Sequence, residues 1–551
     1  MMLVWSIPVG VLLGAALLIV LVNRGQPNIG LSWLAAILAA LIVWGWTVSL
    51  YWQTDLRSEA VTGRVIAFSQ DLPAETEAFS FAGNTAVSSG FILDRISYPY
   101  MLAVSAFLVI LLLTAPSYME PQTAPRLWFF YLLIETIGYL SVSARNLTFV
   151  IYGWVIFDGI DLLTRYLQTR PGRISRGYVT AIAVRFVGTI LAASSMAYSA
   201  ADPDFSGEMF ISARAGIFLL LACGLRMGIL PISQPYSEMS SSRVGLGTML
   251  RLVSVLTVMP VLGRIPMDSM SLNLAAVLSV AGGFASLVGA VGWLLSENAF
   301  TGNTYFALSI CGMAFVSALH GNQASLTVWG VSLALTCASL SLYQIHNLFL
   351  NILASLLIIC FSGMPFTPNA AGWYGLVSRP YSLKDLLFLI VMLLLTAGAF
   401  NHILRTAEKK FTDLEPWMRS VYPLGFLAGI GTHCFIGMFC LDEMFTMGVI
   451  PASVTAFAGG AMLAAFLHWM PERIRTQNML AWTRKGISLF WELMQRLLDM
   501  NWLIALGGAG MRAASRMVSA VTLILENNGG LIWEFLLLAF LVAAAFAGGF
   551  R

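Results

Sequence analysis

Charged residues are scarce in this chain of 551 residues. Only 10% of them are Asp, Glu, Lys or Arg, whereas 58% are hydrophobic, and the mean hydropathy is +0.81. This balance excludes an ordinary soluble protein, in which about a quarter of the residues carry charge. The formal net charge of +3 gives no signal for nucleic acid, and we expect no nucleic-acid partner.

The sequence also lacks the motifs that hold cofactors and metals. Its six cysteines form no CxxC pair and lie in or beside apolar segments, which predicts buried structural thiols rather than ligands of zinc or an iron–sulfur cluster. No P-loop, GxGxxG or HExxH occurs, and no predicted strand precedes Gly507–Gly510. We therefore expect that this chain binds no cofactor or metal and carries no electrons.

Long apolar runs fill most of the chain. A membrane-spanning helix needs about 20 mainly apolar residues, and these runs are continuous, whereas membrane strands alternate. The sequence predicts an all-α polytopic membrane protein of about 14–16 transmembrane helices, two of them broken. The predicted segments cover residues 3–22, 31–51, 98–115, 126–143, 147–166, 178–200, 210–230, 244–263, 271–295, 304–320, 324–343, 347–364, 383–404, 420–440, 449–469 and 531–549.

Two polar regions interrupt this pattern. Short apolar runs around Gly83-Asn84 predict an outer β-hairpin. Later, large apolar residues such as Trp491 and Trp502 recur at helical spacing among basic residues, which favours an amphipathic helix lying laterally on the inner membrane surface over a soluble tail. The predicted parts are an N-terminal transmembrane hairpin (1–52), an outer loop (53–97), a transmembrane core (98–470), a lateral helix (471–530) and a C-terminal anchor (531–551).

The distribution of charge predicts the orientation. The first apolar segment has no basic flank and no cleavage site, so we interpret it as a membrane helix rather than a signal peptide. If it enters from outside, the basic cluster Arg165–Arg176 falls inside and the acidic segment Asp71–Glu77 outside, as the positive-inside rule requires, with Arg379 and Lys384 as exceptions. We expect a multi-pass protein of the inner (cytoplasmic) membrane, in contact with lipid, with both termini outside.

Two predicted helices contain breaks. Gly224, Arg226 and Gly228 lie just before Pro231, and Gly363 lies just before Pro365. Proline donates no backbone hydrogen bond, so it frees a carbonyl group of the preceding turn. Interrupted helices at membrane depth occur where they line a cavity or are buried in protein, and a pair of them indicates a transport fold.

A few ionisable residues lie inside the apolar segments. A charge at the centre of a membrane costs roughly 2.5–3.5 kcal/mol on insertion scales, so such residues are either paired or functional. Glu135 is half of a proton relay or a structural partner for an arginine, and the spacing of Asp161 and Arg165 favours a plain ion pair. Histidines near helix ends relay protons or, more commonly, form hydrogen bonds at interfaces. The candidate ion-translocation residues are Glu135, Asp158, Arg185, Arg226, Arg251, His320 and His346.

The order of these features resembles the antiporter-like membrane subunits of respiratory complex I, of Mrp-type antiporters and of membrane-bound hydrogenases. The largest complex I subunit of this type is the most similar in layout. The resemblance spans most of the chain and implies an antiporter-like membrane subunit with a role in proton or cation translocation. It also implies other membrane subunits as partners, contacted through the lateral helix and transmembrane faces. The motifs that carry it are Gly90–Ser97, Asn146–Trp154, Gly224–Pro231, Tyr305–Ser309, Gly363–Pro365 and Leu525–Gly530.

The chain departs from the family at the ionisable positions. Val155 replaces the glutamate that follows Gly-Trp, and Asp158, expected on the same helix face, replaces it only partly. Arg226 replaces the lysine of the broken seventh helix, and arginine does not release its proton. The basic residue of the eighth helix falls near Met249–Arg251 in altered form, and no lysine occurs in Thr367–Ala371.

Three hypotheses remain open from the sequence. The chain is an ion-translocating subunit of a redox-driven complex of the NADH–quinone oxidoreductase type, a scaffold subunit that has lost pumping, or an ion-coupled partner of another system such as an inorganic-carbon uptake complex. In all three, any oxidoreductase activity belongs to other subunits.

Overall fold

The computed structural model describes most of the membrane core and little of the C-terminal region. Two units, Met1–Trp491 and Glu492–Arg551, are each described by themselves. The described residues are 3–24, 28–53, 90–117, 124–168, 176–202, 211–212, 214–232, 244–267, 270–296, 299–377, 383–404, 409–441 and 450–469, with 486, 489, 509, 515–516, 519, 534–540 and 542–543.

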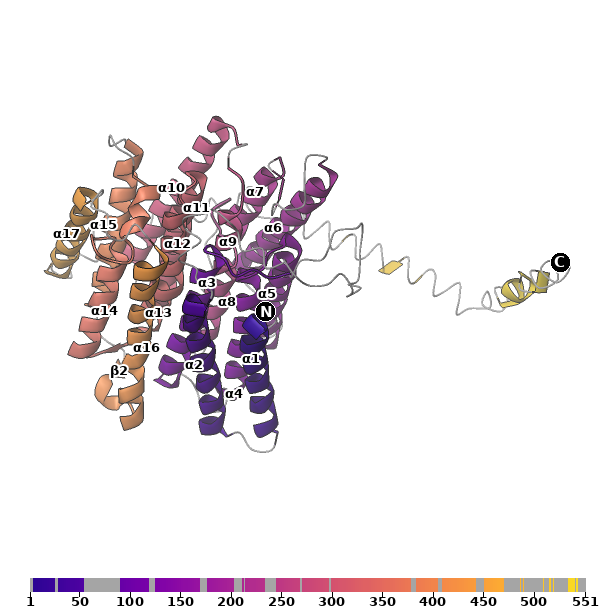
Figure 1. The fold of residues 1–551 in the computed structure, drawn as a ribbon, viewed down its shortest axis with the longest axis horizontal. Helices are drawn as coiled ribbons and strands as arrows, with labels where there is room; N and C mark the ends of the chain where they lie inside the picture. The colour runs from indigo at the N-terminus through magenta and orange to yellow at the C-terminus, as the bar shows by residue number, and fades with distance from the viewer. Residues whose placement is uncertain are drawn as a thin grey trace. The chain divides into compact units, whose positions relative to one another are not determined.

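The first half of the core is a succession of apolar helices (Figure 1). The seventh predicted segment is short in the structure, and the eighth is divided into two helices. The elements are α1 (Leu3–Val22), α2 (Ile29–Gln53), α3 (Ser97–Thr114), the 3-10 turn η2 (Ala115–Ser117), α4 (Ala124–Val142), α5 (Leu147–Gln168), α6 (Arg176–Ala201), α7 (Gly216–Arg226), α8 (Val244–Leu256) and α9 (Met259–Gly263).

The second half contains two π-helical segments, η4 and η7, and a pair of two-residue parallel strands. Its elements are α10 (Leu272–Leu295), α11 (Ala299–Leu319), α12 (Gln323–Ser332), η4 (Leu333–Cys337), α13 (Ala338–Leu342), β1 (Ile345–His346), α14 (Leu348–Phe361), the 3-10 helix η5 (Ala370–Gly375), α15 (Leu383–Ile403), β2 (Lys409–Lys410), the 3-10 turn η6 (Phe411–Asp413), α16 (Pro416–Phe435), η7 (Ile436–Cys440) and α17 (Ile450–Trp469).

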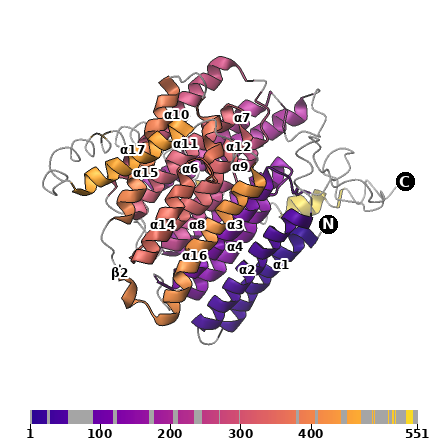
Figure 2. The same ribbon diagram turned by 60° about the vertical axis from the view of Figure 1, so that its left-hand side comes forward.

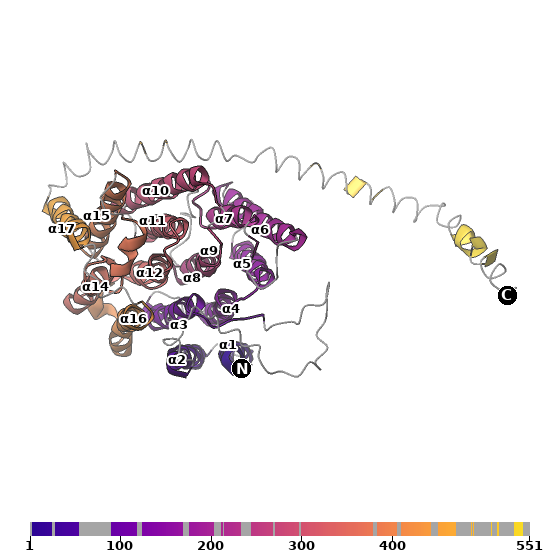
Figure 3. The ribbon, with the colours of Figure 1, turned by 45° about the horizontal axis from the view of Figure 1, so that its top comes forward.

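Helices α3, α8 and α12 form the middle of the bundle (Figure 3). Helix α3 is buried on nearly all sides, as expected of a helix that is apolar all round. Helices α5, α6 and α7 lie at one side of this middle layer, and α14, α15 and α17 lie at the opposite side (Figure 3). Helices α1 and α2 run beside α3 and α4, and α16 also packs on α3 (Figure 2).

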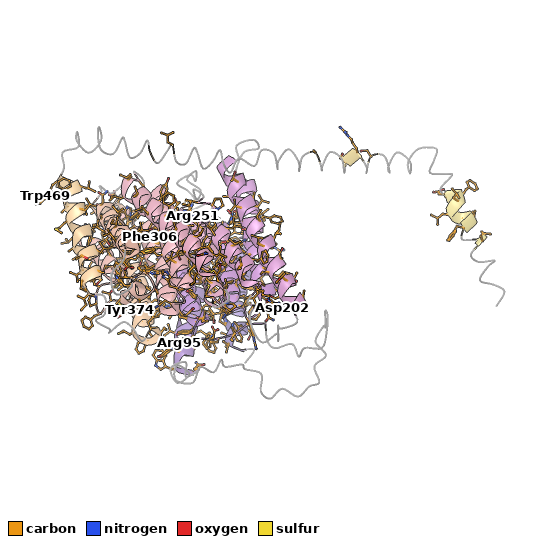
Figure 4. The ribbon with its side chains drawn as sticks, turned by 90° about the horizontal axis from the view of Figure 1, so that it is seen from above. Arg95, Asp202, Arg251, Phe306, Tyr374 and Trp469 are labelled. Atoms are coloured by element: carbon orange, nitrogen blue, oxygen red, sulfur yellow. The ribbon has the colours of Figure 1, made fainter. Side chains whose placement is uncertain are left out.

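The helices have the lengths and composition of membrane spans. Arg95, Asp202 and Tyr374 lie at one end of the bundle and Trp469 lies at the other (Figure 4). In the described part of the chain, 12 helices are long and apolar enough to cross a membrane. The segments predicted at 210–230 and 347–364 are represented by the shorter apolar helices α7 and α14. The predicted all-α polytopic membrane fold is thus confirmed.

The predicted outer β-hairpin gains no support from the structure. Most of it lies outside the described residues, and in the part that is described Phe91 forms an antiparallel bridge with Ala144, which lies outside the predicted hairpin. The entry to α3 is held by side chains instead. Asp94 accepts hydrogen bonds from the Ser97 N–H (2.7 Å) and from Arg264 (3.0 Å). The predicted lateral helix lies almost entirely outside the described residues, and only 534–540 and 542–543 of the predicted anchor are described.

Candidate functional site

Helix α5 has an inner and an outer face. Trp154, Phe157 and Asp161 recur at three- to four-residue spacing and are buried, whereas Val155 is 49% exposed on the opposite side. The Asp158 side chain is only 13% exposed and points toward α6 and α7. Val155 and Asp158 are only three residues apart, but their surroundings differ, because Val155 is half-exposed whereas Asp158 meets the neighbouring helices.

Asp158 joins two arginines from different helices. Its carboxylate lies 2.9 Å from Nη1 of Arg226 on α7 and 3.3 Å from Nη1 of Arg185 on α6. Arg185 also reaches Asp161, one turn further along α5, at 2.5 Å. We call these four residues the charge cluster. Two guanidinium groups and two carboxylates balance in charge, so the cluster meets the requirement that charges inside a membrane be paired.

Arg226 is held from several sides besides Asp158. Its Nη1 donates to Thr189 Oγ1 (2.7 Å) and to the Arg185 carbonyl (3.3 Å). Its guanidinium lies 4.6 Å from the centre of the Trp154 ring, and Trp154 in turn donates to Thr257 Oγ1 at 2.9 Å. A guanidinium over an aromatic face gains a cation–π interaction, which is stronger where water is excluded. These contacts fix the guanidinium even if Asp158 changes its protonation state.

The break in α7 brings Arg226 into this position. The helix ends at Arg226, and the Gly224 carbonyl then accepts from the N–H groups of Ile229 and Leu230 in a tight turn before Pro231. On α6, Gly188 permits the close approach of α7: a Cβ there would lie 3.0 Å from the Ala222 carbonyl oxygen and from Cγ of Arg226. The predicted helix break thus carries one arginine of the charge cluster.

Glu135 lies apart from the charge cluster contacts, on α4. Its side chain is fully buried, and among the described residues neither carboxyl oxygen has a hydrogen-bond partner. One turn further along α4, the Tyr139 hydroxyl lies 3.1 Å from Thr47 Oγ1 of α2. An isolated ionised carboxylate is very unfavourable in such surroundings. Glu135 therefore remains a candidate proton-binding residue, without an arginine partner in the described part.

The other predicted residues are scattered. Arg251, which Figure 4 labels, lies on α8. It is close enough to Cys337 of η4 for an electrostatic interaction. His320, at the end of α11, is exposed and its Nδ1 lies 2.7 Å from the Gly375 carbonyl oxygen. The backbone of His346 pairs with that of Lys410 between β1 and β2, and the His346 side chain is not among those that the structure describes. Asp161 forms an ion pair with Arg185, and the side chain of Arg165, its predicted partner, is not among those that the structure describes.

The second helix break contains a polar group that the sequence prediction missed. After α14 the chain turns at Gly363 (φ 68°) and Pro365, and Asn369 returns into the interior. Asn369 Nδ2 donates to Ser332 Oγ (2.6 Å) and to the Phe361 carbonyl (3.0 Å), and His433 Nε2 lies 2.8 Å from Asn369 Oδ1. The side-chain amide thus satisfies a carbonyl at the end of a broken helix. A polar Asn within a buried stretch was the available signal.

The comparisons with known proteins bear on the fold. No known protein family and no curated protein matches the sequence. A chain of the Mrp complex from a Dietzia species matches with a TM-score of 0.64 and 14% identity, over 99% of this chain and 63% of that one. A chain of the membrane-bound sulfane sulfur reductase, an archaeal respiratory membrane complex, matches with a TM-score of 0.55 and 14% identity, over 98% and 99%.

A chain of respiratory complex I from Thermus thermophilus also matches, with a TM-score of 0.47 and 16% identity, over 84% of this chain and 99% of that one. The present chain spans 63% of the length of the matching Mrp chain. The first two likenesses confirm the fold that the sequence resemblance implied, that of a membrane subunit of these large complexes. At such identities they establish the fold alone.

Proposed function

We propose that this chain is a proton- or cation-translocating, antiporter-like subunit of a redox-driven, multi-subunit complex in the inner membrane. The observation that carries the proposal is the charge cluster, Asp158, Asp161, Arg185 and Arg226, buried between α5, α6 and the broken helix α7. Ionisable groups inside a membrane mark ion pathways, and helix breaks mark the sites of transporters. The fold shared with chains of the Mrp and sulfane sulfur reductase complexes supports a place in such an assembly.

The proton-exchanging groups in this proposal are carboxyl groups. Arginine keeps its proton at any physiological pH, so Arg185 and Arg226 act as fixed positive charges. Protonation of Asp158 weakens its pairing with both arginines at once, while Thr189 and Trp154 still hold Arg226. Asp158 is then the switching member of the charge cluster. Electron carriers and cofactors belong to partner subunits, which contact this chain through its transmembrane faces and lateral helix.

A scaffold role is the second candidate, and two observations favour it. Position 155 holds an outward-facing valine and therefore no ionisable group. In addition, every member of the charge cluster has an oppositely charged partner. Paired charges of this kind also serve to hold helices together.

Two variants separate translocation from scaffolding. Proton uptake is measured with a pH-sensitive dye in vesicles that carry the intact complex. Asp158→Asn should abolish uptake while the complex stays assembled. Asp158→Asn combined with Arg226→Gln removes one charge of each sign and leaves the Arg185–Asp161 pair intact. If the carboxyl group exchanges protons, the double variant stays inactive. If the cluster only holds the helices, the double variant recovers uptake, and the translocation role of Asp158 is refuted.

The matched control is Arg214→Gln. Arg214 lies 3.6 Å from Asp202, and its side chain is 64% exposed, so this change removes an arginine from an ion pair outside the charge cluster. Uptake should remain at the level of the unaltered complex.

A further inference from the structure

The second helix break contains a buried hydrogen-bonded group that bears no fixed charge. We call Ser332, Asn369 and His433 the amide cluster. Asn369 is fully buried and His433 is 1% exposed. The three residues come from α12, from the segment after α14, and from α16, and are linked by the 2.6 Å and 2.8 Å contacts given above. The amide cluster thus connects the broken helix to two continuous membrane spans.

The hydrogen bonds determine which ring nitrogen of His433 carries the proton. The Phe361 carbonyl only accepts hydrogen bonds, so the Asn369 atom that contacts it must be the amide nitrogen. The amide oxygen then faces His433 Nε2, and this oxygen also only accepts, so Nε2 must bear the hydrogen. In the neutral ring the lone pair therefore lies on Nδ1, which is buried and has no hydrogen-bond partner among the described residues.

Among the described elements that contact α16, none carries a charged side chain that would bind a proton in place of His433; Arg95, which acts on Cys440 of η7, keeps its proton. The described elements that contact α16 are helices α2, α3, α13 and α14 and the segments η2, η4 and η7. None of these elements contains Asp, Glu, Lys or Arg. Helix α16 itself has only Arg419, near its start. The other titratable groups on these elements are thiols and phenols, which ionise only at alkaline pH in water. They are Cys337, Cys360, Cys434, Cys440, Tyr51, Tyr98, Tyr100 and Tyr422.

The backbone around the amide cluster is irregular at three places. The π-helix η4 begins directly after Ser332, the π-helix η7 begins three residues after His433, and the chain reverses at Gly363. π-helical turns inside α-helices are frequent at functional sites. The amide cluster is therefore located where three spans depart from regular helical geometry. A contact that only holds helices together does not require such departures.

We propose that His433 is the proton-binding residue of the second helix break and that Nδ1 is the atom that takes up and releases the proton. A proton added to the Nδ1 lone pair gives an imidazolium whose Nε2–H still donates to Asn369 Oδ1. Release from the same atom restores the neutral ring, and no other bond changes. Asn369 orients the ring. The inference rests on the proposed ion translocation and assigns the proton-binding role to α16, since the broken segment Thr367–Ala371 contains no lysine.

The atom-level assignment is tested by nitrogen NMR on the complex in lipid, with the chain labelled with ¹⁵N at histidine. The chain has only five histidines, and His433→Gln identifies the signals of His433 by their disappearance. As the pH is lowered through the range in which the complex stays assembled, Nε2 should keep its hydrogen while the Nδ1 signal moves from the bare to the protonated position. A proton on Nδ1 at every pH, or an Nδ1 signal that never moves, overturns the inference.

Translocation provides the second readout. Glutamine at position 433 still offers an N–H to Asn369 but takes up no proton at neutral pH, so His433→Gln should abolish proton uptake in an assembled complex. The matched control is His402→Gln, because His402 is also buried but bonds the Leu340 carbonyl (3.0 Å) and packs against the Trp293 and Tyr343 rings. Full uptake by His433→Gln refutes the inference alone. No uptake by the unaltered complex refutes the proposed function, and the NMR titration then decides the inference.

Discussion

The two helix breaks of this chain differ in the chemistry of the polar groups that they hold. At the first, α7 ends at Arg226, whose guanidinium enters a cluster of four charged side chains. At the second, α14 ends and the neutral amide of Asn369 bonds Ser332, a backbone carbonyl and His433. Both breaks free polar groups within an apolar bundle. Ion pairs satisfy them at one break, and neutral hydrogen bonds do so at the other.

This difference has an energetic consequence. Burying charges requires a large desolvation free energy that only a well-placed partner offsets, so loss of one partner leaves an uncompensated charge. A neutral hydrogen bond has a smaller net effect, and its loss leaves only an unsatisfied polar group. The first break should therefore be rigid and sensitive to substitution, whereas the second tolerates change and gains a charge only when His433 binds a proton.

The largest effect on stability is expected from Arg226→Gln. Loss of one partner of a buried ion pair typically lowers the free energy of unfolding by about 3–5 kcal/mol. Asp158 would keep Arg185, but the cluster would carry a net negative charge. Unfolding of the chain by denaturing detergent in lipid–detergent micelles measures the change. A loss below about 1 kcal/mol would place this pair with exposed ion pairs and would remove the energetic distinction between the breaks.

A smaller effect is expected from Asn369→Leu at the second break. The change leaves the Phe361 carbonyl, Ser332 and His433 without their amide partner, which should lower the free energy of unfolding by about 1–3 kcal/mol. Ser332→Ala removes only one of these three contacts and should have less effect in the same unfolding measurement. If Asn369→Leu proves as damaging as Arg226→Gln, the neutral break is not the more tolerant one.

The sequence predicted the locations of the breaks much better than their contacts. Glycine and proline mark both breaks because their effect on the backbone is local. The contacts are long-range: Asp158 and Arg226 are 68 residues apart, and Asn369 and His433 are 64 apart. A lone histidine within an apolar helix gives no signal of a distant partner. A hydrogen-bonded role is the common one for such a histidine, but the partner of His433 could be identified only once the structure placed α16 beside the second break.

The direction of α5 shows a similar limit. Helical periodicity places residues 155 and 158 only about 60° apart, which suggested a shared face. The boundary between the lipid-facing and inward surfaces falls between them, so Val155 is half-exposed while Asp158 meets two arginines. The location of this boundary depends on which helices pack against α5, and α6 and α7 take their places only in the complete bundle. The sequence alone thus identified the ionisable residues but not their partners.

The smallest effect is expected from Arg214→Gln, the counterpart of Arg226→Gln outside the charge cluster. The Arg214 side chain is 64% exposed although that of Asp202 is only 5% exposed, so solvent screens this pair in part and its loss should cost less than the loss of the Arg226 pair. Salt should sharpen the contrast. Raising the ionic strength weakens exposed pairs but has little effect on buried ones. Unfolding measured at low and at high salt should therefore give the Arg214 variant a penalty that falls and the Arg226 variant a penalty that persists. If both penalties fell together, water and ions would reach the charge cluster, and Asp158 would lie in an open aqueous pathway rather than a closed one.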